Sequence, residues 1–220
     1  MSHPTVQATP ASPRKGDRTA AAILAAAEDL FAEKGFEGAT LRDVADRVGI
    51  RIPSLYNHFA SKEALYGAVL ERGLSPILEM LSKLVEESSR DAESVEPRAV
   101  VEWIVGVLDA QPHLPLLLLR ETLSGGNRLT PELRDWIAPI FERAGEAAAG
   151  GAPPTRWSSD QIPQLVLAIY HVVIGYYAIA PFYKQLNGQD LLAEKARARQ
   201  TAFLVELVET LFSPDSTLAR

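Results

Sequence analysis

Residues 40–62, TLRDVADRVGIRIPSLYNHFASK, contain the spacing that decides the fold of the N-terminal part of this chain. With Leu41 as the first position, the fifth is the small residue Ala45 and the ninth is Gly49. The fifteenth position is the aliphatic residue Leu55. Two steeply crossing helices leave room for little more than a methyl group at their contact, and the turn needs a residue that tolerates positive φ. The spacing fits a helix-turn-helix, whose second helix is free to enter the major groove of DNA. It fits a plain pair of packed helices almost equally well.

The sequence on both sides of this stretch is also helical in character. Apolar residues recur at helical spacing, and no strand-like alternation persists for more than a few residues. The pattern predicts an all-α fold of about nine helices, in which a three-helix helix-turn-helix domain precedes a larger C-terminal helical bundle. The predicted helices cover residues 17–34, 40–49, 53–59, 61–89, 97–111, 113–124, 131–149, 159–186 and 190–212. Gly35 is predicted to end the first helix in a left-handed conformation, Ser61 to cap the fourth, and Gly73 and Pro76 to kink it.

Composition limits the classes of function. The chain has 220 residues and no cysteine, which excludes a disulfide framework, a thiolate metal cluster and a cysteine nucleophile. His113 and His171 are too isolated for a metal site, and neither a metal nor another cofactor is expected. The net charge of −6 argues against coating of nucleic acid. Residues 1–66 nevertheless hold eight basic and eight acidic residues, so the excess acidity belongs to the remainder of the chain.

The residues that follow the turn make the helix-turn-helix interpretation specific. Leu55-Tyr56-Asn57-His58-Phe59, followed by Lys62-Glu63 and Leu65, resembles the recognition helix of TetR/AcrR-type transcriptional regulators. Further agreements lie upstream, at Ala27, Leu30-Phe31, Lys34-Gly35-Phe36, Thr40 and Val44-Ala45. The resemblance covers about residues 17–70, and beyond them it is only architectural. It implies a cytoplasmic, sequence-specific transcriptional regulator, most often a repressor that a small molecule releases from DNA.

The resemblance also implies how the chain is divided. Residues 17–63 are expected to form the DNA-binding domain, and residues 64–214 the ligand-binding and dimerisation domain. Residues 1–16 contain three prolines and little to bury, so they are expected to form a disordered arm. A ligand is expected to shift the fourth helix, which joins the two domains, and so to change the separation of the two recognition helices of a dimer.

Candidate DNA contacts follow from chemistry and from the motif. Thr40 at a helix N-terminus can bind a phosphate oxygen of DNA. Tyr56 and His58 can reach the DNA backbone, and Lys62 supplies a positive charge to a phosphate. Residues that lead the second helix are expected to meet base edges, and Arg42 or Arg51 can donate two hydrogen bonds to guanine. Family members often have serine or threonine at position 51, so Arg51 loses a helix cap and is interpreted as a specificity residue. The complete set is Thr40, Arg42, Arg51, Ile52, Pro53, Ser54, Tyr56, Asn57, His58 and Lys62; Leu55 and Phe59 are expected in the core.

Two features of the C-terminal part predict a homodimer. Residues 161–183 contain no charged side chain, and small residues there allow helices to approach closely. The last helix adds apolar residues, and the resemblance implies an interface of four helices, two from each subunit. The predicted interface residues are Ala168, Gly175, Ala178, Phe203 and Leu207. A two-fold dimer predicts double-stranded DNA with a pseudo-palindromic operator as its partner.

A ligand pocket is the less specific prediction. Apolar helices between about residues 74 and 180 are expected to line it, which favours a hydrophobic or aromatic effector of unknown identity. The candidate residues are Trp103, Leu117, Arg120, Glu121, Trp136, Phe141, Tyr170 and Tyr177. Arg120-Glu121 fits either the polar end of the pocket or a structural ion pair, and the structural role is favoured.

Other classes of function stay open as alternatives. Residues 161–183 are long enough to cross a bilayer, but they contain His171 and four tyrosines, so a helix buried on all sides in the protein is preferred and no membrane partner is expected. An enzyme is not expected, because the sequence contains no nucleophile elbow, phosphate-binding glycine loop or zinc-binding histidine pair. The alternative to a DNA-binding regulator is a helical interaction or membrane-attached protein without DNA binding.

Overall fold

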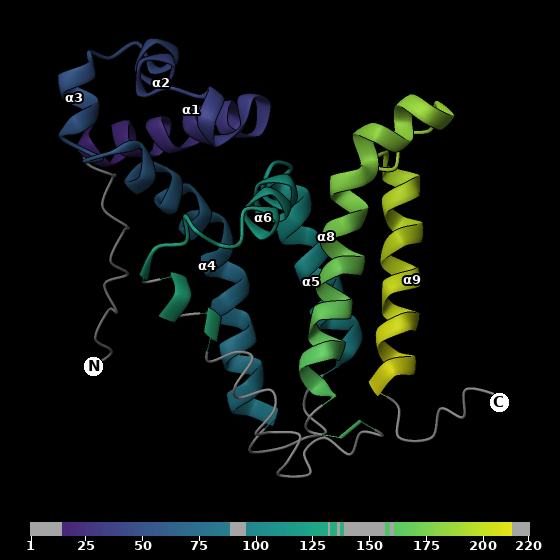
Figure 1. Cartoon of the computed structure of the whole chain (residues 1–220). Coiled ribbons are helices and arrows are strands. Elements are labelled where there is room, and N and C mark those ends of the chain that lie inside the picture. The colour runs from purple at the N-terminus through teal and green to yellow at the C-terminus, as the bar shows by residue number, and fades with distance from the viewer. Residues whose placement is uncertain are drawn as a thin grey trace, which may run out of the picture. The chain divides into compact units, whose positions relative to one another are not determined.

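A computed structural model describes residues 15–88, 96–131, 133–135, 137–138, 157–158 and 161–212. These residues form helices and loops, with no strand among them, as the sequence predicts. The helices with complete bounds are α1 (Lys15–Gly38), α2 (Leu41–Val48), α3 (Ile52–Tyr56), α4 (Lys62–Ser88), α5 (Pro97–Ala110), α6 (Leu114–Leu123), α8 (Ile162–Asn187) and α9 (Glu194–Phe212) (Figure 1). Short helical stretches between residues 131 and 138 lie where another helix is predicted; the rest of that segment and residues 1–14 of the predicted arm lie outside the described residues.

The chain divides into two compact units, residues 1–65 and 66–220. In the first unit, α1 presents an apolar face to the two short helices that follow. Ile23, Leu30 and Phe31 on this face are at most 1% exposed, and so are Val44 and Ala45 on α2. Leu55 of α3 is completely buried. The three helices therefore share one small core, as the helix-turn-helix spacing predicts.

Two glycines take the conformations that their positions require. Gly49 ends α2 with φ 73° and ψ 33°, and its N–H and that of Ile50 bond back to the last turn of the helix. Gly35 has φ 72° and ψ 172°, so the regular part of α1 stops there and one further turn continues to Gly38. A side chain at either position would be forced into a strained backbone conformation.

The second unit is a bundle in which α6 packs on α8, and α5 packs on α9. Val101 and Val105 of α5 form a buried cluster with Leu204 and Val205 of α9. Arg197 of α9 pairs with Asp109 of α5 at 2.8 Å, and Tyr177 of α8 donates a hydrogen bond to the same carboxylate at 3.0 Å. Burial and the charge of Asp109 raise the pKa of Tyr177, which keeps its hydroxyl a donor. This carboxylate thus ties three helices together.

The last helix begins later than predicted. We expect a helix from Asp190, but α9 begins at Glu194. One oxygen of Asp190 accepts the N–H of Leu192 at 2.9 Å, and the other pairs with Lys184 of α8 at 2.7 Å. These bonds lower the pKa of Asp190, the pairing with Lys184 being the larger cause. Asp190 therefore belongs to the turn that follows α8 and not to α9.

The expectation that the uncharged helix is buried on all sides is wrong for a single chain. Of the 18 consecutive residues that form the most apolar part of α8, 28% are buried. Phe182 is 58% exposed and Leu186 is 65% exposed. By length and composition, Pro163–Asn187 is the one described helix that is apolar enough to cross a membrane. This helix therefore presents apolar side chains at the surface of the part of the chain that the structure describes.

Candidate functional site

The predicted DNA-contacting residues lie on α2, α3 and the adjoining turns, and most of them are exposed. Tyr56 is 51% exposed, and five others are also exposed: Thr40, Arg42, Arg51, Pro53 and Asn57. Ile52, Ser54, His58 and Lys62 are half-buried. Leu55 is buried as expected, whereas Phe59 is only half-buried. The structure thus brings the predicted residues to the surface of one small unit, while their roles stay predictions.

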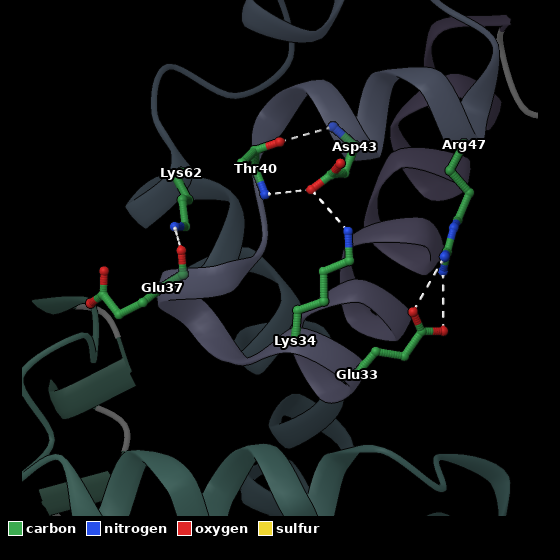
Figure 2. Close-up of polar contacts among 7 residues, drawn as sticks. All are labelled: Glu33, Lys34, Glu37, Thr40, Asp43, Arg47 and Lys62. Atoms are coloured by element: carbon green, nitrogen blue, oxygen red, sulfur yellow. Dashed lines mark hydrogen bonds and ion pairs between the residues drawn. The ribbon is translucent and has the colours of Figure 1, made fainter.

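Thr40 begins α2 with a reciprocal pair of hydrogen bonds (Figure 2). Its hydroxyl oxygen accepts the N–H of Asp43 at 3.1 Å, and its own N–H donates to the Asp43 carboxylate at 3.1 Å. The ammonium of Lys34 on α1 lies 3.2 Å from the same carboxylate. Sequence reasoning assigned Thr40 to phosphate but missed this arrangement, although the Thr-x-x-Asp spacing is that of a capping box.

The capping box already uses the hydroxyl oxygen and the backbone N–H of Thr40, and it places the carboxylate of Asp43 at the start of α2. Hydrogen bonds from Thr40, and then the contact with Lys34, hold the pKa of Asp43 below its usual range. The contribution of Asp43 to stability is therefore complete at neutral pH and is lost as the pH falls through this lowered pKa. Lys34 offsets the negative charge of Asp43, which otherwise opposes the approach of a phosphate to this helix end.

Replacing Thr40 by valine is expected to lower the melting temperature by about 2–4 °C, because loss of an N-cap costs about 1 kcal/mol. Valine keeps the shape of threonine but cannot accept the N–H of Asp43. Thr40→Ser is the matched control, since it keeps the hydroxyl and is expected to melt close to the wild type. Thermal unfolding followed by circular dichroism measures both. A valine variant as stable as the wild type would show that the cap contributes nothing.

Lys62 connects the start of α4 to the end of α1 (Figure 2). Its ammonium donates to the carbonyl of Glu37 at 3.3 Å and lies 4.4 Å from the ring centre of Phe36. The Phe36 ring in turn stacks on Phe31 at 5.9 Å. An ammonium has three N–H donors, so the bond to Glu37 leaves donors for a phosphate. Lys62 therefore contacts the end of α1, and its role as a phosphate contact stays a prediction.

Salt dependence separates these two roles of Lys62. Replacing it by methionine is expected to weaken DNA binding and to lower the slope of log K against log salt by about one, because one phosphate contact is lost. Lys83→Met, at an exposed position farther along α4, is the control and is expected to leave the slope unchanged. Fluorescence anisotropy titrations between 50 and 200 mM salt measure the slope. A Lys62→Met variant with weaker binding at an unchanged slope would leave only the positioning role.

Arg51 occupies the position before α3 with extended backbone dihedrals, and its side chain makes no capping hydrogen bond. The predicted loss of a helix cap at this position is therefore confirmed. Pro53 in the first turn has no N–H to satisfy, which lessens the cost. By contrast, Arg47 at the end of α2 is paired with Glu33 of α1 through two contacts of 3.3 and 3.4 Å (Figure 2). The two arginines thus give a matched comparison within one unit.

The predicted pocket residues do not gather at one described place. Tyr170 of α8 shares a hydrogen bond with Thr122 of α6 at 3.0 Å, whereas Tyr177 bonds to Asp109 of α5. Trp103 is 37% exposed on α5, and Leu117 is buried on α6. Trp136 and Phe141 lie outside the residues whose side chains are described. Sequence reasoning missed Asp109 and Arg197, because nothing local in the sequence signals that α5 and α9 meet there.

Glu121 differs from the other pocket candidates. It is 3% exposed, and one of its oxygens accepts the backbone N–H of Arg128 at 2.7 Å. The sequence suggested two roles for Arg120-Glu121, an ion pair or a pocket end. Adjacent residues on a helix do not face each other, and the Glu121 carboxylate is directed to the loop after α6. Neither of the two predicted roles includes this hydrogen bond to the loop.

Two of the predicted interface residues lie on one face of α8, and the other three lie beside that face or on α9. Ala168 and Gly175 lie on one face of α8 with the exposed residues Val172, Ile179, Phe182 and Leu186, at spacings of three and four. We call these six residues the α8 stripe. Ala178 is half-buried beside it, Phe203 on α9 is 53% exposed, and Leu207 is half-buried. Ala168 has only a methyl side chain and Gly175 has none, which leaves room within the stripe for another helix to approach.

Comparisons with known proteins agree with this geometry. Residues 23–69 match the family model described as bacterial regulatory proteins, tetR family. The chain is 30% identical over 152 residues to the HTH-type transcriptional repressor AcnR of Corynebacterium efficiens, covering 67% of this chain and 73% of AcnR. It is 29% identical over 176 residues to the HTH-type transcriptional regulator RutR of Escherichia coli K12, covering 79% and 80%. A crystal structure of an HlyIIR mutant protein has a TM-score of 0.60 at 17% identity, covering 92% of this chain and all of that one.

Proposed function

This chain belongs to the TetR family of bacterial regulatory proteins, and on that basis we propose that it is a homodimeric repressor that binds a pseudo-palindromic operator. The observation that supports the proposal best is the surface of residues 40–62, where Thr40, Arg42, Arg51, Tyr56 and Asn57 are exposed while Val44, Ala45 and Leu55 are buried in the core. Arg51 and the residues of α3 supply base contacts. Thr40, Tyr56, His58 and Lys62 supply contacts to the phosphate backbone.

The α8 stripe supports the homodimer. Its apolar residues cost free energy in water, and a second copy of the same helix covers them with an identical face. Gly175 and Ala168 let the two helices approach closely, and Phe203 of α9 extends the surface. A two-fold axis through this surface repeats the recognition helix, so the operator carries two half-sites in inverted order.

Release by a small molecule is the finer part of the proposal. The effector is hydrophobic or aromatic and binds in the second unit, and α4 transmits its effect. This helix spans Lys62–Ser88, so its first residues belong to the unit that contacts DNA and the remainder to the other unit. An effector that binds one arrangement of α4 more tightly shifts the population toward the form that leaves the operator.

The proposed regulator acts in the cytoplasm and catalyses no reaction. The matched relatives described above are transcriptional regulators, and RutR and AcnR are both named as HTH-type proteins. The groups of the second unit with shifted pKa values, such as Tyr177, are explained by bonds between helices and do not require a catalytic role.

Selection of bound sequences from a random DNA pool tests the proposal. The purified full-length protein is expected to enrich an inverted repeat whose two halves are about one helical turn apart, or a multiple of it. A direct repeat or a single half-site would contradict the two-fold dimer. No enrichment of any sequence would contradict sequence-specific binding.

A further inference from the structure

Lys34 belongs to α1, but its ammonium lies at the start of α2. It is 3.2 Å from Oδ2 of Asp43. The same Oδ2 accepts the backbone N–H of Thr40 at 3.1 Å (Figure 2). One carboxylate oxygen therefore meets both the cap of α2 and a cation from another helix. Lys34 is not among the DNA contacts predicted from the sequence.

The end of α1 holds Lys34 in this place. Lys34 directly precedes Gly35, whose φ of 72° ends the regular part of the helix. One further turn leads to Gly38, where an added Cβ would lie 3.3 Å from the Cβ of Lys34. A Cβ contact this short is tighter than ordinary packing, so glycine at position 38 leaves room for the stem of Lys34 beside the turn that leads to Thr40.

The carboxylate of Asp43 has two opposite effects at the start of α2. It completes the capping box, and its negative charge favours the positive end of the helix dipole. The same charge repels a DNA phosphate that approaches Thr40. The Thr40 hydroxyl accepts the N–H of Asp43 at 3.1 Å and still has its own O–H to donate to a phosphate. The cap and the phosphate contact are therefore compatible in hydrogen bonding but opposed in charge.

We propose that Lys34 is a positioning residue for DNA binding, which neutralises Asp43 so that a phosphate can approach Thr40 while the capping box stays intact. This deepens the proposed function and rests on the phosphate contact of Thr40 in it. The Lys34 side chain is 44% exposed and that of Asp43 is 34% exposed. An exposed pair of this kind adds little to stability, so its main effect is on the charge that an approaching phosphate meets.

A second ion pair between the same two helices gives an internal comparison. Arg47 in the last turn of α2 pairs with Glu33 of α1 at 3.3 Å, and both side chains are exposed. Arg47 follows Thr40 by seven residues, which is about 10 Å along the helix axis. The Debye length at 150 mM salt is about 8 Å, so exposed charges at this distance are largely screened. The pair of Glu33 and Arg47 therefore has little influence on a phosphate at Thr40.

Lys34→Met removes the ammonium and keeps an unbranched stem. Its affinity for the inverted-repeat duplex enriched from the random pool is expected to fall about threefold for each half-site, and hence about tenfold for a dimer. Lys34→Arg keeps the charge and is expected to bind within twofold of the wild type. Arg47→Met is the matched control and is expected to change the affinity by less than threefold. Anisotropy titrations of the full-length proteins at 150 mM salt measure these affinities.

An Asp43→Asn background separates action through Asp43 from a direct contact of Lys34 with DNA. Asparagine keeps a side-chain oxygen for the N–H of Thr40 but carries no charge for Lys34 to neutralise. In this background, Lys34→Met is expected to weaken binding by less than threefold. A tenfold loss in both backgrounds would overturn the proposal and make Lys34 a direct phosphate contact. Equal losses for Lys34→Met and Arg47→Met would also overturn it, because the effect would then be one of general charge.

Thermal unfolding and binding by the wild type keep the remaining outcomes apart. Lys34→Met is expected to melt within about 2 °C of the wild type, because an exposed pair contributes little to stability. A much lower melting temperature that accompanies weaker binding would overturn the proposal in favour of a structural role. A Lys34→Met variant that binds the duplex as tightly as the wild type refutes the role of Lys34 and leaves the repressor in place. A wild type that enriches no duplex refutes the proposed repressor itself.

Discussion

Replacing Phe182 by glutamate is expected to convert the protein from a dimer to a monomer and to weaken operator binding by 100-fold or more. Phe182 lies in the α8 stripe and is 58% exposed in the single chain, so the substitution changes no buried contact of the subunit. In a symmetric dimer it places two carboxylates in an apolar interface, where neither has a partner. Each half-site alone binds weakly, because the second recognition helix no longer arrives with the first.

Leu123→Glu is the matched control for this prediction. Leu123 at the end of α6 is 79% exposed and lies outside the stripe, so the same change of side chain is expected to leave both the dimer and operator affinity intact. Analytical ultracentrifugation without detergent measures the oligomeric state, and anisotropy titration measures the affinity. A Phe182→Glu variant that stays dimeric would show that another surface forms the dimer. A wild type that requires detergent to remain dispersed would favour a membrane-attached protein.

Replacing Arg51 by alanine is expected to weaken operator binding by about 10- to 100-fold, while binding to unrelated DNA falls much less. The Arg51 side chain is exposed before α3 and makes no capping bond, so it is available to donate two hydrogen bonds to a guanine. Such a contact discriminates between bases by about 1–3 kcal/mol. Non-specific binding depends instead on the summed phosphate contacts.

Two variants separate base recognition from charge at this position. Arg51→Lys keeps the charge but cannot donate two parallel bonds, so it is expected to lose specificity while binding to unrelated DNA is retained. Arg47→Ala removes the same charge from α2, where Glu33 already pairs with it, and is expected to change operator affinity by less than threefold. Titrations against operator and scrambled DNA give both quantities. Equal losses for Arg51→Ala and Arg47→Ala would mean that Arg51 acts through charge alone.

Features that depend on neighbouring residues could be predicted from the sequence. The positive φ of Gly49, the burial of Ala45 and the cap by Ser61 follow from sterics and hydrogen bonding over a few positions. The capping bond of Asp43 to Thr40 has the same local character and was available from the spacing, although the pairing with Lys34 on another helix was not.

Features that depend on distant residues could not be predicted. The apolar sequence of α8 fits a buried helix and an uncovered interface equally well, because hydrophobicity does not specify which chain covers it. The sequence places Glu121 beside Arg120, whereas its carboxylate accepts the backbone N–H of Arg128, seven residues away across a loop. The start of α9 depends on the pairing of Asp190 with Lys184, which requires knowing how α8 ends.

The most direct test of this account is a footprint of the full-length protein on the DNA that flanks its own gene. We expect one protected region that contains an inverted repeat, with protection lost for Arg51→Ala and for Phe182→Glu at concentrations that saturate the wild type. Loss in both variants would tie the α3 surface and the α8 stripe to one symmetric complex. Protection that is absent in the wild type, or unchanged in both variants, would contradict operator recognition by these two surfaces.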